Sequence, residues 1–177
     1  TFQVESLDSK YQEVQENIWQ STQASNGSKR ILASMSWGYR DNQGPSSEDL
    51  AHEVLPPKSQ EWVRKIAAEN IEMTYRRLAL RELFQNAQLT YTRNPGVYSG
   101  NTIDEFLFDK KKGFCEHFAG SYATLARALG IPSRVISGYQ GGEYNKVGNF
   151  WRVTQRYAHA WVEIWTGKEW SRVDPTT

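Results

Sequence analysis

The chain has 177 residues, which is enough for one domain with a hydrophobic core that needs no disulfide or metal. With 13% aromatic and 23% charged residues, its composition is typical of a folded globular protein and excludes an intrinsically disordered segment. The net charge of +1 gives no electrostatic basis for binding nucleic acid, the single cysteine excludes an internal disulfide, and no apolar run is long enough for a membrane span.

The N-terminal part is predicted to be an extension of helix and irregular structure. An amphipathic helix is predicted from Ser6 to Gln20, because apolar residues recur there at the spacing of one helical face. These residues are Leu7, Tyr11, Val14 and Ile18. An irregular stretch follows, with one short helix after Ser47, and we place the domain boundary at residue 54. Since the chain begins without Met and stops at VDPTT, we expect it to be cut from a longer protein.

Two further helices and a short strand are predicted ahead of the cysteine. The helices run from about Gln60 to Met73 and from about Tyr75 to Ala87, each with apolar residues along one side. The segment LTYT that follows has the composition of a short strand.

A strongly apolar helix is predicted to begin at Cys115. Gly130 and Pro132 give it a clear end, because glycine favours the C-cap and proline prevents continuation. The remaining sequence is rich in Val, Ile and Trp and predicts antiparallel strands. Helices followed by strands are the order of an α+β fold.

Cys115 is predicted to lie where a thiol can react. In the first turn of a helix, unpaired N–H groups and the helix dipole stabilise a thiolate. The same N–H groups can bind the oxyanion that forms when a carbonyl is attacked. The alternative is a small buried apolar cysteine, which is the commoner case for an isolated free cysteine.

Of the three histidines, His159 is the candidate base. His52 lies in the irregular region and is expected at the surface. His117 is two residues after Cys115, so on a helix the two side chains point apart, and capping or packing is expected of it. In AHAWVEIW, alternation places His159 and Trp161 on one face of a strand.

A predicted hairpin would bring the carboxylate of Asp174 close to His159. If Gly167-Lys168 form the two-residue turn of TGKE, the register sets Trp161 opposite Asp174. His159 then lies diagonal to Asp174 on the same face, within side-chain reach. A helix-borne Cys, a strand-borne His and an Asp on the neighbouring strand are the arrangement of papain-like sites, in which the acid orients the imidazole.

Three blocks of this sequence strongly resemble the bacterial transglutaminase-like domains. They are FLFDKKKGFCEHFAGSYATLARALGIPSRVISGYQGGE, AHAWVEIW and WSRVDPT. The resemblance covers about two-thirds of the chain, residues 55–177. Within the family, the sequence most resembles the TgpA-like branch. Members of that branch are multi-pass membrane proteins with this domain outside the cytoplasm. It implies a papain-like α+β core, in which the nucleophile helix packs against an antiparallel sheet and further helices precede it. It also implies a catalytic triad of Cys115, His159 and Asp174. The chain departs from the family at Tyr157, where a small polar or acidic residue is expected.

The resemblance implies acyl transfer on the γ-carboxamide of peptide glutamine. Cys115 would form a thioester, with a lysine amine as acceptor in cross-linking or water in deamidation. Trp151 and Trp161 would bind substrate and shelter the thioester, although ordinary sheet packing is the alternative for both. A cysteine peptidase or amidase with the same triad is the second function, and a non-catalytic binding module is the third.

Partners and location follow from the same resemblance. We expect protein or peptide substrates bearing Gln and Lys, and no nucleic acid. One Cys and three dispersed His do not make a metal-ligand set, so no metal and no cofactor are expected. The resemblance implies the periplasmic face of a bacterial membrane, with anchoring through segments absent from this chain.

Overall fold

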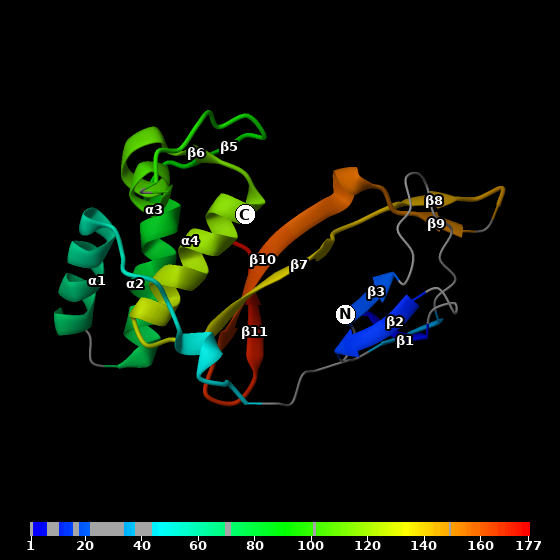
Figure 1. The fold of residues 1–177 in the computed structure, drawn as a ribbon, viewed down its shortest axis with the longest axis horizontal. Coiled ribbons are helices and arrows are strands. Elements are labelled where there is room, and N and C mark those ends of the chain that lie inside the picture. Colours follow the sequence, from blue (N-terminus) through cyan, green and yellow to red (C-terminus); the bar gives the residue numbers. More distant parts are fainter. Residues whose placement is uncertain are drawn as a thin grey trace. The chain divides into compact units, whose positions relative to one another are not determined.

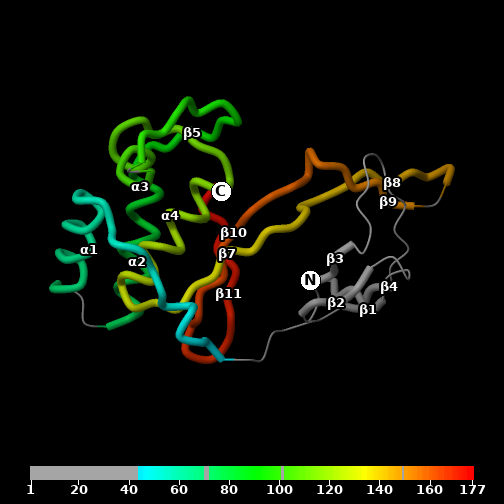
Figure 2. Tube along the Cα trace, viewed as in Figure 1, coloured from blue at the N-terminus to red at the C-terminus, as the bar shows by residue number. Residues whose placement is uncertain are grey.

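The computed structural model describes residues 44–177 except residues 70, 71, 101 and 149, together with the backbone of four short strands in residues 1–43. The chain forms two compact units, Thr1–Asn42 and Gln43–Thr177 (Figures 1 and 2). The first unit therefore ends ahead of the boundary expected at residue 54. The candidate site lies in the second unit.

The helix predicted for Ser6–Gln20 is wrong, because the segment contains strands. β2 and β3 pair antiparallel across it, and β1 pairs antiparallel with β4. The strands are β1 (Phe2–Ser6), β2 (Tyr11–Gln15), β3 (Ile18–Ser21) and β4 (Ser34–Trp37). The apolar residues that suggested a helix are mostly aromatic or β-branched, and such residues favour strands. In so short a run, strand preference outweighs helical spacing.

The helices predicted ahead of and at Cys115 are confirmed. A short 3₁₀ turn also occurs after Ser47, as expected, and a π-helical segment continues from α3. The helical segments of the second unit are η1 (Glu48–Leu50), α1 (Pro57–Glu69), α2 (Met73–Asn86), α3 (Thr102–Asp104), η2 (Glu105–Lys110), α4 (Cys115–Ala128) and η3 (Gln155–Tyr157). Gly130 adopts a left-handed conformation with φ of 77° just after α4, which explains why a glycine ends this helix.

An antiparallel sheet of order β11-β10-β7 forms the other layer of the second unit. Its strands are β7 (Ser133–Tyr139), β10 (Ala158–Trp165) and β11 (Trp170–Val173). Two short pairs accompany it: the parallel pair β5 (Thr90–Tyr91) with β6 (Lys112–Gly113), and the antiparallel pair β8 (Glu143–Asn145) with β9 (Phe150–Arg152). The α+β order predicted from the sequence is thus confirmed.

The helix α4 lies between this sheet and the helices α1 and α2 (Figure 1). Its residues Ala119, Leu125 and Ala126 are completely buried. Opposite them, Ala160 and Val162 of β10 are buried, whereas neighbouring residues of the strand are not. The small alanine side chains allow the helix to approach the sheet closely, so α4 is the centre of the core.

The hairpin register predicted from TGKE is confirmed. Trp165 pairs with Trp170 and Val162 pairs with Val173, so the register places Asp174 at the level of Trp161. The N–H of Thr166 donates to the Glu169 carbonyl at 3.0 Å across the turn. A slip by one residue would turn Val162 out of the core, which is why burial fixes this register.

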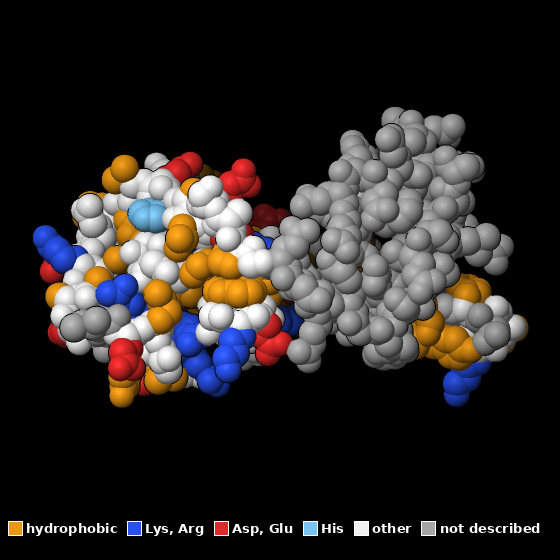
Figure 3. All heavy atoms as spheres, turned by 90° about the horizontal axis from the view of Figure 1, so that it is seen from below, with side chains coloured by type: hydrophobic (Ala, Val, Ile, Leu, Met, Phe, Trp, Pro, Cys, Tyr) orange, Lys and Arg blue, Asp and Glu red, His pale blue; other side chains and the backbone are white. Residues whose placement is uncertain are grey.

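The hairpin of β8 and β9 exposes apolar side chains. They gather at the right of the view in Figure 3. Trp151 is 65% exposed and Val147 fully exposed. The Trp151 ring packs against Tyr144, with centroids 5.4 Å apart. Trp151 therefore lies on a projecting surface and not in the core.

The start of α1 is capped by a residue far along the chain. Pro57 needs no hydrogen-bond partner for its nitrogen, but the next two N–H groups of the helix do. The N–H groups of Lys58 and Ser59 each donate to the Asp104 carboxylate at 2.8 Å, and the Ser59 hydroxyl donates to it at 2.5 Å. Asp104 is only 5% exposed, so its substitution would leave buried donors without an acceptor.

We expect Asp104→Ala to lower the free energy of unfolding by about 1–3 kcal/mol, because it removes the cap and leaves two backbone N–H groups unsatisfied. Urea denaturation measures this. The control is Asp109→Ala, which removes an exposed ion pair with Lys58 and should cost less than about 1 kcal/mol. Equal losses in the two variants would contradict the cap.

Candidate active site

His159 and Asp174 are joined by a hydrogen bond. The His159 Nε2 lies 2.7 Å from Asp174 Oδ2, and both side chains are largely buried, with 14% and 11% exposed. Since a carboxylate only accepts, Nε2 carries the proton and Nδ1 of the neutral ring is left as the acceptor. The pair lies where the hairpin register predicted it. An imidazole held in this tautomer can take up a proton at Nδ1.

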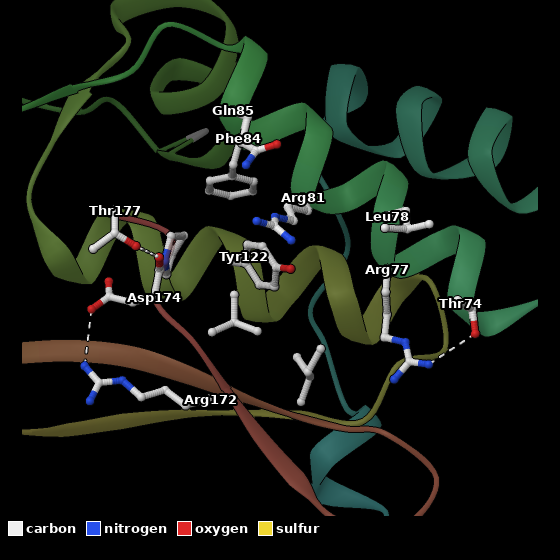
Figure 4. A pocket seen from close by; sticks show the side chains of 13 residues that line it. Thr74, Arg77, Leu78, Arg81, Phe84, Gln85, Tyr122, Arg172, Asp174 and Thr177 are labelled. Carbon is white, nitrogen blue, oxygen red and sulfur yellow. Dashed lines mark hydrogen bonds and ion pairs between the residues drawn. The ribbon is translucent and has the colours of Figure 1, made fainter.

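The Asp174 carboxylate is held at both oxygens. Oδ1 accepts hydrogen bonds from the Thr176 hydroxyl at 2.6 Å and from the Thr176 N–H at 3.2 Å. Oδ2 also accepts from Arg172 at 3.3 Å, as Figure 4 shows. Burial acts to raise the pKa of Asp174, but the hydrogen bonds from Thr176 and His159 outweigh it and hold the pKa below its ordinary value. Asp174 is therefore ionised and fixed in orientation.

Trp161 supports the same pair from the side. Its ring stacks on the His159 ring at 6.3 Å and 24°, and the Arg172 guanidinium lies 4.4 Å from the Trp161 ring. A Cβ at Gly138 would lie 3.0 Å from the Trp161 ring, so the neighbouring strand leaves room for the indole. Trp161 thus contacts the His–Asp pair directly, and its role in substrate binding stays a prediction. Trp151 is not among the residues that line the cavity at His159.

Cys115 is the first residue of α4 and is half-buried. It packs against the core and lies beside Tyr91 of β5. Tyr91 in turn lines a cavity of about 240 Å³ together with His159 and Asp174. Tyr91 therefore neighbours Cys115 and also lines the cavity at the His–Asp pair. The other residues that line this cavity are Arg93, Gln140, Arg156, Tyr157, Ala158, Thr176 and Thr177.

His117 caps α4 and is not part of the His–Asp pair, which confirms the expectation of capping or packing. Its Nδ1 accepts a hydrogen bond from the Phe114 N–H at 3.4 Å. The ring packs edge-on against Phe114 at 4.4 Å and lies 4.8 Å from Tyr98. Burial lowers the pKa of His117, although Glu116 acts in the opposite direction, so the ring favours its neutral form. His52 is exposed, as expected.

A larger cavity of about 500 Å³ lies on the α2 side of Asp174 (Figure 4). Arg77 and Arg81 of α2 line it with Tyr122 of α4. Burial raises the pKa of Tyr122 to about 12, against the opposing charges of these two arginines. His159 does not line this cavity. Asp174 thus lines both cavities, whereas His159 lines only the smaller one.

Three neighbours of the site were not found from the sequence. Tyr91 lies beside Cys115, and Arg172 and Thr176 donate hydrogen bonds to Asp174. Thr176 had a local signal, since an Asp side chain often accepts a hydrogen bond from the backbone two residues on, as Asp174 does here from the Thr176 N–H. Tyr91 had none, because only the pairing of two distant strands brings it to Cys115.

Within the described residues, no group of three or more His, Cys, Asp and Glu side chains is placed to hold a metal ion. In the same part of the chain, no helix combines the length and the apolar character that crossing a membrane requires.

The chain belongs to the transglutaminase-like superfamily, whose family model matches residues 60–175. It is 48% identical over 99 residues to a protein-glutamine gamma-glutamyltransferase of Pseudomonas aeruginosa, and 32% identical over 130 residues to the uncharacterised protein YebA of Bacillus subtilis. These alignments cover 55% and 69% of the chain, but only 15% and 18% of the two relatives. The chain thus spans less than a fifth of the length of either relative.

A similar fold is known from a solved structure. The periplasmic domain of TgpA from Pseudomonas aeruginosa matches with a TM-score of 0.76 at 31% sequence identity, over 97% of this chain and 62% of that one. The same domain bound to ethylmercury matches equally well. The resemblance stated from the three sequence blocks is confirmed, and so is the transglutaminase-like α+β fold.

We expect Thr176→Val to raise the pKa of Asp174, because it removes the hydroxyl bonded to Oδ1. A carboxylate with a lowered pKa stabilises the fold above its unfolded pKa of about 3.9, and this stabilisation is lost as pH falls through the folded value. The variant should therefore be less stable at pH 7 and lose less stability below about pH 4. Urea denaturation across this range measures both.

The control for Thr176→Val is Thr177→Val, whose hydroxyl contacts only the Asp174 backbone carbonyl among the interactions described. It should keep the acid dependence of the wild type. An unchanged dependence in Thr176→Val would contradict the role of its hydroxyl.

We expect His117→Phe to lower the free energy of unfolding by about 1 kcal/mol at pH 7.5, because the Phe114 N–H loses its acceptor while the aromatic packing is kept. The lowered pKa of His117 makes the wild type lose stability as pH falls through about 6.5, where the unfolded chain takes up the proton first. The His117→Phe variant should lack this pH-dependent loss of stability. Urea denaturation at pH 5 and 7.5 measures it, with the exposed His52→Gln as control.

Proposed function

We propose that this domain catalyses acyl transfer from peptide glutamine, with Cys115 as nucleophile, His159 as base and Asp174 as the acid that orients it. The observation that carries the proposal is the 2.7 Å hydrogen bond between His159 and Asp174, at a cavity that is also lined by Tyr91, a neighbour of Cys115. Membership of the transglutaminase-like superfamily supports it, as does the similarity to a relative named protein-glutamine gamma-glutamyltransferase.

In the first step, His159 Nδ1 accepts the thiol proton and the Cys115 sulfur attacks the γ-carboxamide carbon of glutamine. A C–S bond forms and the electron pair of the C=O double bond moves to oxygen. As the C=O bond reforms, the imidazolium gives its proton to the nitrogen, the C–N bond breaks and ammonia leaves. A γ-glutamyl thioester remains on Cys115.

In the second step, a primary amine attacks the thioester carbon. His159 takes a proton from the amine, a C–N bond forms, the C–S bond breaks and the thiolate recovers a proton. A lysine amine gives an isopeptide cross-link, and water in its place gives glutamate. Throughout, Asp174 stays ionised and stabilises the imidazolium without taking its proton.

The expected partners are proteins or peptides that carry Gln and Lys. We also propose a location outside the cytoplasm, because the similar solved domain of TgpA is described as periplasmic. Anchoring to a membrane through segments outside this chain stays a prediction.

The test is incorporation of a fluorescent primary amine into a glutamine-rich protein whose lysines are methylated. Wild type should incorporate it and Cys115→Ala should not, because the variant cannot form the thioester. Asp174→Asn should be slower by about 10²–10⁴-fold, since the imidazole loses its orienting acceptor.

Tyr75→Phe, at an exposed position on α2, is the control and should retain wild-type activity. Cysteine-dependent peptide cleavage without amine incorporation would contradict the proposal in favour of a peptidase. Equal inertness of wild type and Cys115→Ala would contradict it in favour of a binding module.

A further inference from the structure

Side chains of α2 that donate hydrogen bonds line the larger cavity at regular intervals. Arg77, Arg81 and Gln85 follow one another at a spacing of four residues, so they lie along one face of the helix. In the view of Figure 4, the Arg81 guanidinium lies between the amide of Gln85 and the ring of Tyr122. Arginine donates hydrogen bonds and accepts none, and a glutamine amide can donate as well. One wall of this cavity is therefore a row of donors.

The positive charge of this wall is not neutralised by a neighbouring acid. Three arginines and one aspartate line the cavity, and the aspartate, Asp174, already accepts a hydrogen bond from the third arginine, Arg172, at 3.3 Å. Within the part of the chain that the structure describes, Arg81 makes no hydrogen bond or ion pair, and Arg77 hydrogen-bonds only to the Thr74 hydroxyl, at 3.3 Å. Two like charges four residues apart on a helix repel each other, and a bound anion would offset this repulsion.

A buried hydroxyl from α4 faces the same space. Tyr122 is only 3% exposed, and its ring packs against Phe84 with the centroids 5.0 Å apart. Figure 4 shows its hydroxyl directed to the side of the cavity where Arg81 lies. Among the described residues this hydroxyl has no hydrogen-bond partner. Because the raised pKa of Tyr122 keeps the phenol protonated at neutral pH, the hydroxyl can donate.

The unpartnered hydroxyl separates this cavity from an ordinary solvated surface. Exposed arginines are common and do not indicate a site by themselves. A buried hydroxyl without a partner, in contrast, destabilises a fold, and nearly all buried polar groups in native proteins are hydrogen-bonded. The position of Tyr122 beside Arg81 therefore indicates a ligand that accepts a hydrogen bond and carries negative charge.

The lining of the cavity narrows the chemistry of this ligand. A guanidinium matches the two oxygens of a carboxylate. The volume of about 500 Å³ lies in the range of sites for small ligands. A small inorganic anion would leave the apolar part of the lining without a contact. This apolar part consists of Leu78, Phe84, Ile164, Val173 and Pro175.

We propose that the larger cavity is a second binding site, which takes an organic carboxylate. Arg81 and the Tyr122 hydroxyl donate to its oxygens, Arg77 adds positive charge, and its apolar part packs against the apolar lining. The carboxylate belongs either to a free organic acid or to an acidic side chain of a peptide, which share this chemistry. The inference goes beyond the proposed function and does not depend on it, because neither Cys115 nor His159 lines this cavity.

The experiment measures binding of 3-phenylpropionate from the shifts of the backbone amide signals of α2 and α4 in NMR spectra. The matched probe is 3-phenylpropionamide, which has nearly the same shape without the charge. We expect the amide to bind at least about tenfold more weakly, because it forms no charge-assisted hydrogen bond. In Arg81→Gln and in Tyr122→Phe, the dissociation constant of the acid should rise by about tenfold or more. Arg64→Gln, at an exposed position on α1, should leave it unchanged.

Two further measurements test the role of the Tyr122 hydroxyl and the independence of the site. Without a ligand, Tyr122→Phe should unfold at the same temperature as the wild type or at a higher one, because it removes a buried hydroxyl that has no partner among the described residues. Cys115→Ala should bind the acid as the wild type does. Loss of amine incorporation in that variant with unchanged acid binding keeps this proposal apart from glutamine transfer.

A pair of capped peptides identifies the source of the carboxylate. One has the sequence Ala-Leu-Glu-Leu-Ala, and the other has methionine in place of glutamate. If the glutamate peptide binds more tightly than 3-phenylpropionate and the methionine peptide does not bind, the ligand is an acidic side chain. If the free acid binds more tightly than both peptides, the ligand is a small organic acid.

Several outcomes would overturn the assignment. No binding of 3-phenylpropionate, or equal binding of the acid and the amide, removes the carboxylate site. Acid binding that is unchanged in Arg81→Gln and Tyr122→Phe places the acid elsewhere on the protein. A lower unfolding temperature of Tyr122→Phe without a ligand shows that the hydroxyl has a structural role. Tighter binding of inorganic phosphate than of the acid at these residues replaces the proposal with a phosphate site.

Discussion

The packing of α4 against one face of β10 is the interaction on which the rest of the second unit depends. Ala160, Val162 and Ile164 are buried against the core. Because alternate residues of a strand point to opposite faces, burying this set turns His159 and Trp161 to the other face. On that face Asp174, the residue directly after β11, comes close to His159, because the same burial fixes the register of β11. The geometry of the candidate site therefore follows from core packing. The hydrophobic effect sets the strand register, and this register places His159 next to Asp174.

The parts of this structure that could be predicted are those encoded by local sequence. The ends of α4, the turn of the β10–β11 hairpin and the diagonal placement of His159 and Asp174 all follow from spacing within short segments. The prediction of an N-terminal helix was wrong because the local pattern was ambiguous: a few apolar residues fit the period of a helix and that of a strand equally. The cap on α1 and the proximity of Tyr91 to Cys115 could not be predicted from the sequence, because each involves residues that only the complete fold brings together.

Polar groups around Asp174 form one connected arrangement. Thr176 holds one oxygen, while His159 and Arg172 share the other, and Trp161 lies against both of these side chains. In a partly buried setting such groups reinforce one another, so the effect of changing one depends on whether the others remain. The orientation of the His159 imidazole is thus fixed by several side chains together. They come from β10, from β11 and from the segment that follows β11.

The cap that Asp104 places on α1 also bears on how this unit folds. The first helix of the unit cannot satisfy its own leading N–H groups until a segment 45 residues further along has reached its place. Such a contact has a high sequence separation, so loop-closure entropy opposes it until other parts of the core have formed. We therefore regard α1 and α3 as one cooperative element: neither end of this contact is complete in a nascent chain that stops before residue 104.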